Sequence, residues 1–249
     1  MLIHPTLEKL SALKLGGMVQ ALTEQLQMRD LDGLGFEERL GLLVDREMTE
    51  RHNGKLRIRL KKAHLRLNAV LEDIDYRQPR GLDKSMILGL ASCRWVEEHQ
   101  TVLITGPTGV GKSYLACALA HKACREGYRA LYYRMPRLLQ ELAVARVDGR
   151  YGKILVHLLK QDVLVIDDWG LAPLDDPGRR DLLEILEDRY NRRSTIVSSQ
   201  LPVSAWHEMI GDRTLADAIL DRLVHQAYQL NLKGESMRKM TKSLTQAGH

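Results

Sequence analysis

The segment GPTGVGKS, residues 106–113, constrains the fold of this chain more than any other part of the sequence. It follows the apolar run TVLIT and precedes YLACALAHKA, which has the pattern of a helix. G-x-x-x-x-G-K-[ST] between a strand and a helix is a phosphate-binding loop. Its glycines let backbone N–H groups turn inward around a polyphosphate, and the helix adds the partial positive charge of its N-terminus. A chance glycine-rich turn would lack these flanking elements, so the sequence predicts a nucleoside triphosphate site.

The end of the loop carries the two side chains with expected roles in this site. Lys112 reaches the β- and γ-phosphates, and Ser113 places its hydroxyl on Mg²⁺. The other predicted nucleotide-binding residues are Gly106, Pro107, Thr108, Gly109, Val110, Gly111 and Tyr114.

Length and composition indicate a globular protein. The 249 residues are enough for one α/β domain with a smaller appendage. Hydrophobic residues make up 44% of the chain and charged residues 28%, which is typical of soluble domains. The net charge of +5 favours a polyanionic partner.

The cysteines indicate a reducing compartment. Cys93, Cys117 and Cys124 are odd in number and form no C-x-x-C pair, so a disulfide framework is not expected. Cys117 and Cys124 share a helix face and are expected to pack as small hydrophobic residues. The N-terminus has no signal-peptide pattern, and no apolar run is long enough to cross a membrane. We therefore expect a cytoplasmic protein without membrane contacts.

The first third of the chain has helix periodicity and almost no strand signal. Leucines and Met18 recur at about 3.6-residue intervals from Leu7 to Leu26, with Gly16 and Gly17 as a weak point. A second helix is predicted over 36–49 and a third over 55–73. We expect a helical domain at 1–75, followed by a linker around Pro79 and Gly81.

Strands then alternate with helices, which predicts a doubly wound parallel sheet. We expect an ATPase domain over 76–242 and a disordered tail over 243–249. The predicted strands are 101–105, 129–134, 162–167, 194–199 and 227–232. The predicted helices are 86–98, one that starts near Lys112 and includes 114–123, and 136–146, 150–160, 178–191, 205–209 and 215–225.

The run VLVIDD places two carboxylates at the C-terminal end of a buried strand, where open α/β sheets bind ligands. Asp167 is expected to hold Mg²⁺, and Asp168 to orient or deprotonate the attacking water. The alternative is an aspartate pair that only caps the next helix. At the end of the following strand, Gln200 or Ser199 is expected to hold that water or to contact the γ-phosphate. The alternative there is a polar turn beside Pro202.

Two arginines follow. Arg222 lies off the apolar stripe of its predicted helix, so it could reach the γ-phosphate bound by a neighbouring subunit as an arginine finger. Arg238 could fold back onto the nucleotide of its own subunit. The alternative for each is an ordinary surface arginine.

The segments GPTGVGKSYLACALAHKA, VLVIDDWG, STIVSSQLP, LADAILDRLVH and GESMRK occur in this order. Together they resemble the IstB ATPases of insertion sequences, which belong to the AAA+ superfamily beside the DnaC-type helicase loaders and the DnaA initiator. The resemblance covers nearly the whole chain. The nucleotide motifs specify only the superfamily, whereas LADAILDRLVH followed by LKGESMR specifies IstB.

The resemblance implies an AAA+ P-loop ATPase with a small all-α N-terminal domain that serves oligomerisation or partner contacts. It implies a helper that uses ATP and Mg²⁺, binds double-stranded DNA with little sequence preference, and forms a homo-oligomeric ring or spiral. It also implies a partner, an integrase-like transposase that this helper recruits and stimulates during transposition.

Carried over by motif, Lys112, Ser113 and Asp167 bind ATP and Mg²⁺, and Asp168 serves hydrolysis. Arg222 matches the trans arginine finger, and Arg238 the sensor arginine. The chain departs from the usual pattern in two places. Asp168 replaces the common glutamate, and too few residues follow Arg222 for a full helical lid. We therefore expect a reduced or absent lid and a pocket that a neighbouring subunit completes.

Members of the initiator branch insert helices after the second strand, and here residues 134–160 carry an excess of basic side chains. The predicted DNA-binding residues are Arg134, Arg137, Arg146, Arg150 and Lys153. Such arginines would follow phosphates without reading bases. A second basic run at 51–66 is either a solvated helix face, a second DNA contact or a docking surface for the transposase.

Two other functions compete with the transposition helper. A replicative helicase loader has the same ATPase core and would differ in what its N-terminal region binds. A small-molecule P-loop kinase would need a phosphoryl acceptor, and the paired arginines and basic inserted helices disfavour it.

Overall fold

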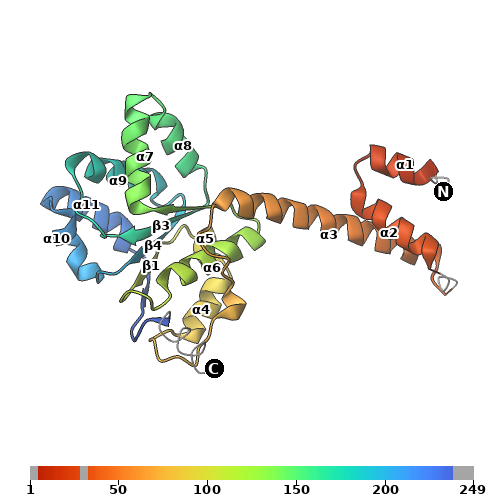
Figure 1. Ribbon diagram of the computed structural model, residues 1–249, viewed down its shortest axis with the longest axis horizontal. Helices are drawn as coiled ribbons and strands as arrows, with labels where there is room; N and C mark the ends of the chain where they lie inside the picture. The colour runs from red at the N-terminus through yellow and green to blue at the C-terminus, as the bar shows by residue number, and fades with distance from the viewer. Residues whose placement is uncertain (1–4, 29–32, 238–249) are drawn as a thin grey trace, which may run out of the picture. The chain divides into compact units, whose positions relative to one another are not determined.

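The computed structural model of the protein describes residues 5–28 and 33–237 (Figure 1). The chain forms two compact units, residues 1–58 and 59–249. The expected domain boundary near residue 75 remains a prediction. The expected tail at 243–249 lies outside the described residues.

The first unit is helical. It contains α1 Pro5–Ala12, α2 Gly16–Gln27 and the first part of α3 Phe36–Ala63. A turn with Lys14 at φ 58° separates α1 from α2, close to the weak point that the two glycines predict.

The side chain of Glu47 joins α2 to α3. Its buried carboxylate accepts hydrogen bonds from the backbone N–H groups of Gly17 at 2.8 Å and Met18 at 3.2 Å. The first N–H groups of a helix have no partner within it, so Glu47 caps α2 from the neighbouring helix. Arg51 donates to the same carboxylate at 2.6 Å, and this hydrogen bond is the main cause that lowers the pKa of Glu47.

The prediction of two helices over 36–49 and 55–73 is wrong, because α3 is one helix that ends at Ala63. Gly54 lies inside it without breaking it, since an interior glycine costs only about 1 kcal/mol relative to alanine and its neighbours favour helix. The helix ends where His64 adopts φ 50°. Beyond it, only the single turn η1 Leu71–Asp73 is helical before the second unit's main elements begin.

A five-stranded parallel sheet with the strand order β2-β3-β4-β1-β5 forms the centre of the second unit. This confirms the predicted doubly wound parallel sheet. The strands are β1 Val102–Thr105, β2 Ala130–Arg134, β3 Val163–Trp169, β4 Ser194–Ser199 and β5 Tyr228–Asn231. Residues 163–166 of β3 are fully buried, as expected for a central strand that is covered on both faces.

Helices cover both faces of this sheet (Figure 1). On one face, α6 Lys112–Arg125 packs against β1, β2, β3 and β4. On the other face lie α7 Met135–Val147, α8 Tyr151–Leu159, α9 Asp176–Arg189, α10 Trp206–Ile210 and α11 Arg213–Val224. The short turn η2 Val203–Ala205 precedes α10.

The predicted helix 86–98 is wrong as a single element. It is α4 Lys84–Ala91 followed by α5 Arg94–Glu97, and the chain turns between them at Cys93, where φ is 60°. The buried side chain of Trp95 donates to the backbone of Leu90 at 3.0 Å and closes this corner.

Among the described residues that follow α11, β5 is the last regular element. The backbone from Leu232 onward returns to the phosphate-binding loop, since Leu232 donates to Thr105 O at 2.8 Å and Met237 to Gly109 O at 3.0 Å. Among the residues that the structure describes, no helix combines the length and apolar character needed to cross a bilayer.

The packing of α2 on α3 yields a matched pair of variants. A Cβ at Gly17 would lie 2.6 Å from Glu47 Cα and 2.7 Å from Arg46 O, whereas a Cβ at Gly16 meets no atom within 4 Å. We expect Gly17→Ala to lower the free energy of unfolding of the first unit by about 1–3 kcal/mol, the usual cost of overpacking. Chemical denaturation of the full chain, followed by circular dichroism, measures the change.

Gly16→Ala is the control and should be neutral or stabilise by up to about 1 kcal/mol, because alanine favours helix over glycine. Equal effects of the two substitutions would contradict the close approach of α2 to α3.

Candidate nucleotide-binding site

The loop that joins β1 to α6 requires glycine. Gly106, Gly109 and Gly111 have φ angles of 142°, 89° and 102°, in the region that other residues rarely adopt. A Cβ at Gly109 would lie 2.1 Å from Ser236 Oγ, and one at Gly106 would lie 2.2 Å from Leu232 O. The C-terminal segment therefore packs directly on the loop, and the loop keeps its inward-turned shape because no side chain intervenes.

The N-terminus of α6 has the features of an anion site. No side chain caps it, whereas α4, α9 and α11 are capped by Asp83, Asp175 and Asp212. The Lys112 ammonium folds over the loop and donates to Gly106 O at 2.8 Å and to Pro107 O at 2.7 Å. Uncapped N–H groups and a cation inside a glycine loop fit a polyphosphate.

A cavity of about 310 Å³ adjoins this loop. Leu67, Ile74 and Tyr114 give it apolar walls, and Gly111, Lys112 and Ser113 form its phosphate side. Its size and its mixture of apolar walls with a few polar groups fit a nucleoside.

Part of this cavity comes from the stretch that the sequence presents as a linker. Arg80 donates to Val110 O of the loop at 3.3 Å and to Asp75 O at 2.9 Å, and Ile74 and Asp75 line the cavity. Sequence reasoning missed these residues because Pro79 and Gly81 indicate an exposed connection. The signal was the apolar run 69–71 with Ile74, of which Ala69, Leu71 and Ile74 are buried within the second unit.

The buried carboxylate of Asp167 lies at the carboxyl end of β3, with 1% of its surface exposed. Tyr132 of β2 donates to its Oδ2 at 2.5 Å, and Ser198 of β4 donates to its Oδ1. Burial and the hydrogen bond to Asp167 raise the pKa of Tyr132, which keeps the phenol protonated as a donor. Two neighbouring strands therefore orient this carboxylate.

Asp168 follows in a left-handed conformation, with φ 59°, and its side chain is partly exposed. Arg134 at the end of β2 donates to its Oδ2 at 2.6 Å. Arg66 lies 3.8 Å from a carboxylate oxygen of each of Asp167 and Asp168. The pair of acids thus lies among guanidinium groups, and Arg134, a predicted DNA contact, is one of them.

The end of β4 contacts the loop through Gln200, which accepts a hydrogen bond from Thr108 Oγ1 at 2.7 Å. Ser199 is buried, and its hydroxyl donates to Trp169 O at 2.8 Å and accepts from Leu201 N at 3.0 Å. The structure therefore brings Gln200 to the phosphate side. The hydroxyl of Ser199 belongs to the turn, and Ser198 is the serine that contacts Asp167.

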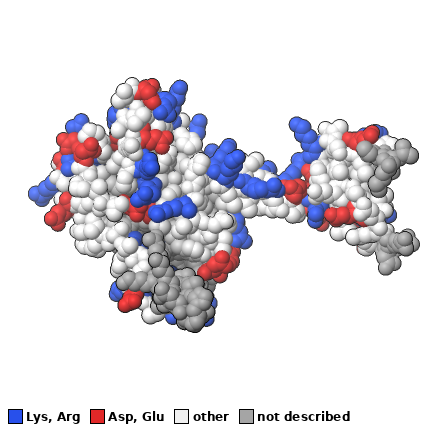
Figure 2. Space-filling model, viewed as in Figure 1, with Lys and Arg blue, Asp and Glu red and all other residues white. Residues whose placement is uncertain are grey.

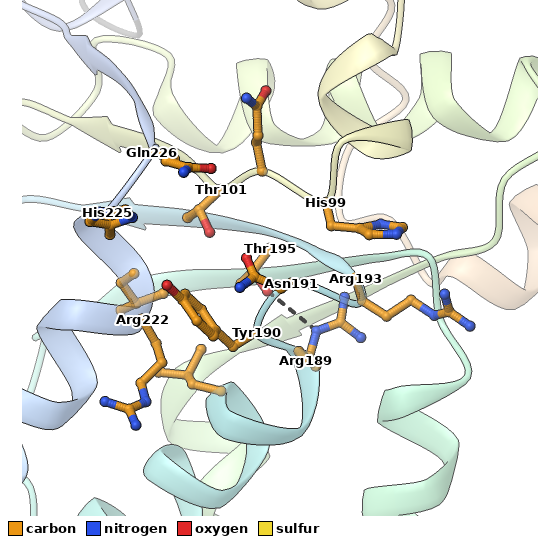
Figure 3. A pocket seen from close by; sticks show the side chains of 13 residues that line it. His99, Thr101, Arg189, Tyr190, Asn191, Arg193, Thr195, Arg222, His225 and Gln226 are labelled. Carbon is orange, nitrogen blue, oxygen red and sulfur yellow. Dashed lines mark hydrogen bonds between the residues drawn. The ribbon is translucent and has the colours of Figure 1, made fainter.

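Arg222 lies at the opposite edge of the sheet. It lines a shallow pocket with Thr101, which precedes β1, with Thr195 near the start of β4, and with Gln226, which precedes β5 (Figure 3). Its guanidinium donates to Glu187 Oε2 at 2.5 Å and to Ala218 O at 3.1 Å. The hydrogen bond that Arg222 donates to Glu187 is the main cause that raises the pKa of Arg222.

In the same pocket, Arg189 links the start of β4 to the segment that precedes β3. Its buried guanidinium donates to Leu158 O at 2.6 Å, to Gln161 O at 3.0 Å and to Thr195 Oγ1 at 3.3 Å (Figure 3). Burial lowers its pKa to about 9. These partners account for Arg189 as a structural residue beside Arg222.

The comparison with known proteins identifies the family. The model of the family described as IstB-like ATP binding protein matches residues 8–245. The chain belongs to the IstB-like ATP-binding family. It is 54% identical over 239 residues to the putative insertion sequence ATP-binding protein y4pL of Sinorhizobium fredii (strain NBRC 101917 / NGR234). This alignment covers 96% of this chain and 98% of the relative.

Two further likenesses agree with this family. The chain is 51% identical over 205 residues to the insertion sequence IS1162 putative ATP-binding protein of Pseudomonas fluorescens, over 82% of this chain and 89% of the relative. The crystal structure of the DnaC helicase loader matches with a TM-score of 0.54 and 24% identity, over 67% of this chain and 97% of the other. The fold is that of an AAA+ P-loop protein.

In this IstB-like chain, several predicted DNA-binding residues have acidic partners. Arg146 forms an ion pair with buried Asp181 and stacks 3.8 Å over the ring of Tyr151. Arg150 pairs with Asp148 at 2.6 Å. The outer part of α7 and α8 accordingly shows basic and acidic side chains side by side (Figure 2).

The remaining two predicted residues are exposed. Arg137 lies on the first turn of α7. Lys153 lines an open groove on α8 together with Val156, His157 and Lys160. Lys and Arg side chains also gather along α3 (Figure 2). Arg238 lies outside the described residues, and the preceding Met237 borders the nucleotide cavity.

The position of Lys112 gives a direct test of the site. Lys112→Ala removes the ammonium that the loop holds at its centre, so we expect the affinity for ATP to fall by a factor on the order of 10², the range for a hydrogen-bonded charge. Fluorescence titration with a labelled nucleotide measures the affinity.

The matched control is Lys122→Ala on the same helix, where the lysine pairs with Glu126 on the surface. This control should bind like the wild type. If Lys112→Ala bound ATP with wild-type affinity, the loop would not be the nucleotide-binding site.

Proposed function

We propose that this IstB-like chain is a Mg²⁺-dependent ATPase that assembles as a homo-oligomer on target DNA and recruits a transposase. Hydrolysis controls the assembly. The observation that carries the proposal is the division of the site between two edges of the sheet. The phosphate loop and the acidic pair lie at the carboxyl edge, whereas Arg222 lies at the amino edge.

The residues at the carboxyl edge fit ATP with Mg²⁺. The glycine loop, the uncapped start of α6 and Lys112 suit the phosphates. The hydroxyl of Ser113 and the carboxylate of Asp167 are hard oxygen donors, and Mg²⁺ needs only one or two of them when phosphates and water supply the rest. Held by these residues, Mg²⁺ would supply positive charge that stabilises the phosphates when they react with water.

Asp168 is the proposed acceptor of the proton from the attacking water, or the group that orients it. It follows Asp167 directly, and its left-handed backbone turns its carboxylate away from the buried position. Gln200 is the second proposed water-positioning residue, because its amide oxygen already lies at Thr108 of the loop. Aspartate is one methylene shorter than glutamate, and Asp168 is engaged by two arginines, which supports slow basal turnover.

The position of Arg222 supports a finger that acts between subunits. The four-residue strand β1, which spans about 13 Å, separates the pocket of Arg222 from the loop of the same chain. Arg222 therefore lies away from the nucleotide site of its own chain, where its guanidinium pairs with Glu187, and its proposed target is the nucleotide of a neighbour. A finger supplied in this way makes hydrolysis depend on assembly.

Subunit mixing tests this arrangement. We expect Arg222→Ala to bind ATP like the wild type and to hydrolyse it more slowly by a factor on the order of 10³, as for other trans fingers. Lys112→Ala binds ATP more weakly, by a factor on the order of 10², but keeps its finger. In a mixture, a Lys112→Ala subunit supplies its Arg222 to the intact pocket of an Arg222→Ala subunit, so turnover partly recovers in a steady-state ATPase assay.

Arg213→Ala, which removes an exposed arginine from the start of the same helix, is the control and should retain turnover. A mixture that recovers no activity at any ratio would contradict action between subunits.

Exposed cations on α7 and α8 are the proposed DNA contacts, in agreement with the net charge of +5. The ion pairs show which of these residues can be substituted to test DNA binding. Arg146 and Arg150 already have acidic partners, and loss of Arg146 would leave buried Asp181 unpaired and destabilise the fold. Arg137 and Lys153 are therefore the residues whose removal reports on DNA alone.

We expect Arg137→Gln combined with Lys153→Gln to weaken binding equally on unrelated duplexes. Each lost phosphate contact should reduce the slope of log K against log salt by about 0.9. Fluorescence anisotropy at several salt concentrations measures both quantities. Arg94→Gln with Lys122→Gln removes the same charge elsewhere and should keep the slope.

An unchanged slope in the α7–α8 variant would move the DNA path to the basic run at 51–66. The helical N-terminal region is proposed to serve oligomerisation or contacts with the integrase-like transposase. Capture of the replicative helicase instead of the transposase by the purified protein would contradict the transposition role and favour a helicase loader.

A further inference from the structure

Arg66 is the part of the basic run that reaches the acidic pair. It lies in the irregular segment 64–70 that follows α3, within the second unit. Its guanidinium is 3.8 Å from Oδ2 of both Asp167 and Asp168, and its side chain is 41% exposed. A hydrogen bond with Tyr132, which itself donates to Asp167, is the main cause that raises the pKa of Arg66. Arg66 therefore belongs to the network around the expected metal ligand.

The same segment is held on α6 by contacts that involve its backbone. Tyr114 of α6 donates to Val70 O at 3.3 Å. Burial raises the pKa of the Cys117 thiol on α6, and hydrogen bonds from the backbone of Leu67 and Arg66 oppose that rise. The backbone of residues 66 and 67 therefore lies next to the Cys117 thiol. Segment 64–70 joins three places, which are the basic end of α3, the acidic pair and, through Leu67, the nucleotide cavity.

The two arginines at the acidic pair differ in how firmly they are held. Arg134 ends β2 and is bonded to Asp168 at 2.6 Å, so the sheet fixes it. Arg66 stands on a segment without regular secondary structure and contacts the carboxylates only at 3.8 Å, although it also has a hydrogen bond with Tyr132. A divalent cation at Asp167 would replace the charge that Arg66 supplies and would repel its guanidinium. Of the two arginines, Arg66 is therefore the one that a cation can displace from the carboxylates.

We propose that Arg66 competes with Mg²⁺ for Asp167 and Asp168, so that binding of the Mg²⁺–nucleotide releases Arg66 and loosens segment 64–70 from α6. Arg66 is a positioning residue for the proposed ATP site, and the inference rests on that site. The coupling is reciprocal, so a ligand that pulls the segment away raises the affinity for Mg²⁺ by the same factor. The basic residues Arg59, Lys61 and Lys62, just before this segment, then respond to the nucleotide state.

The first measurement is the Mg²⁺ concentration that half-saturates the Mg²⁺-dependent part of binding of a fluorescent ATP analogue. We expect Arg66→Gln to lower this concentration by about two- to fivefold, the factor for loss of a partly exposed ion pair. Arg125→Gln is the matched control. Arg125 has the same 41% exposure and pairs with Glu72 in the same unit, away from the carboxylates. Its half-saturating concentration should equal that of the wild type.

The second measurement uses the wild-type chain and reads the position of the segment without any turnover. The alkylation rates of Cys117 and Cys93, both buried, are compared by peptide mass spectrometry with the nucleotide analogue present. Adding Mg²⁺ should raise the rate at Cys117 and leave that at Cys93 unchanged. Leu67 lines the nucleotide cavity, so the bound nucleotide base could itself change the exposure of Cys117. Both samples contain the nucleotide analogue and differ only in Mg²⁺, so this contribution is the same in each. In Arg66→Gln, Cys117 should react faster already and no longer respond to Mg²⁺.

The outcomes separate the two levels of the proposal. A wild-type chain that binds no nucleotide overturns the ATP site itself. A chain that binds nucleotide but shows no Mg²⁺ effect at Cys117 overturns the release of the segment. An unchanged or increased Mg²⁺ requirement in Arg66→Gln overturns the competition. Equal shifts in Arg66→Gln and Arg125→Gln would show a general loosening, which also contradicts it.

Discussion

The burial of Asp167 is the constraint on which the site depends. A carboxylate with 1% exposure is costly in a protein interior unless its oxygens have partners. The sheet supplies these partners from both neighbouring strands, Tyr132 on β2 and Ser198 on β4. The order β2-β3-β4 is therefore also the arrangement that makes a buried aspartate tolerable. All the strands are parallel, so the phosphate loop after β1 lies at the same edge of the sheet as Asp167. The parallel arrangement therefore brings the loop and the carboxylates together.

The sequence predicts elements whose signal is local. The strand β3 is a continuous apolar run, and the loop at 106–113 has fixed spacing, so the doubly wound sheet and the position of the loop are confirmed. Local signals are less reliable for the exact places where helices break. Gly54 suggests a break that the surrounding helix formers override, and Cys93 turns the chain inside a pattern that predicts one helix. The segment 64–80 shows the other limit. Its apolar residues are packed against α6 and the loop, and no period in the sequence indicates which surface they meet.

Charges show this limit more sharply, because a sequence gives the number of arginines but not their partners. Arg134, Arg146 and Arg150 carry the same predicted role as Arg137 and Lys153. In the structure the first three are paired with Asp168, Asp181 and Asp148. The pairing of Arg134 depends on β2 lying beside β3, and that of Arg146 on α7 packing near α9, contacts between segments about 35 residues apart. Arg150 pairs locally, with an aspartate two residues before it. The net basic charge survives this pairing, but the surface that presents it is narrower than the sequence indicates. The roles of the individual site residues stay predictions that the variants above test.

The separation of Arg222 from its own loop is the basis of the proposed control by assembly. Within the chain the acidic pair lies beside Arg66 and Arg134, and Arg222 lies at the other edge of the sheet. Under the proposed function, both conditions would disfavour hydrolysis by the isolated chain. A neighbour that presented its Arg222 to the loop would supply a cation there, and Mg²⁺ bound with the nucleotide would replace the charge of Arg66. The proposed control of hydrolysis by assembly thus rests on where three arginines lie relative to one pair of carboxylates.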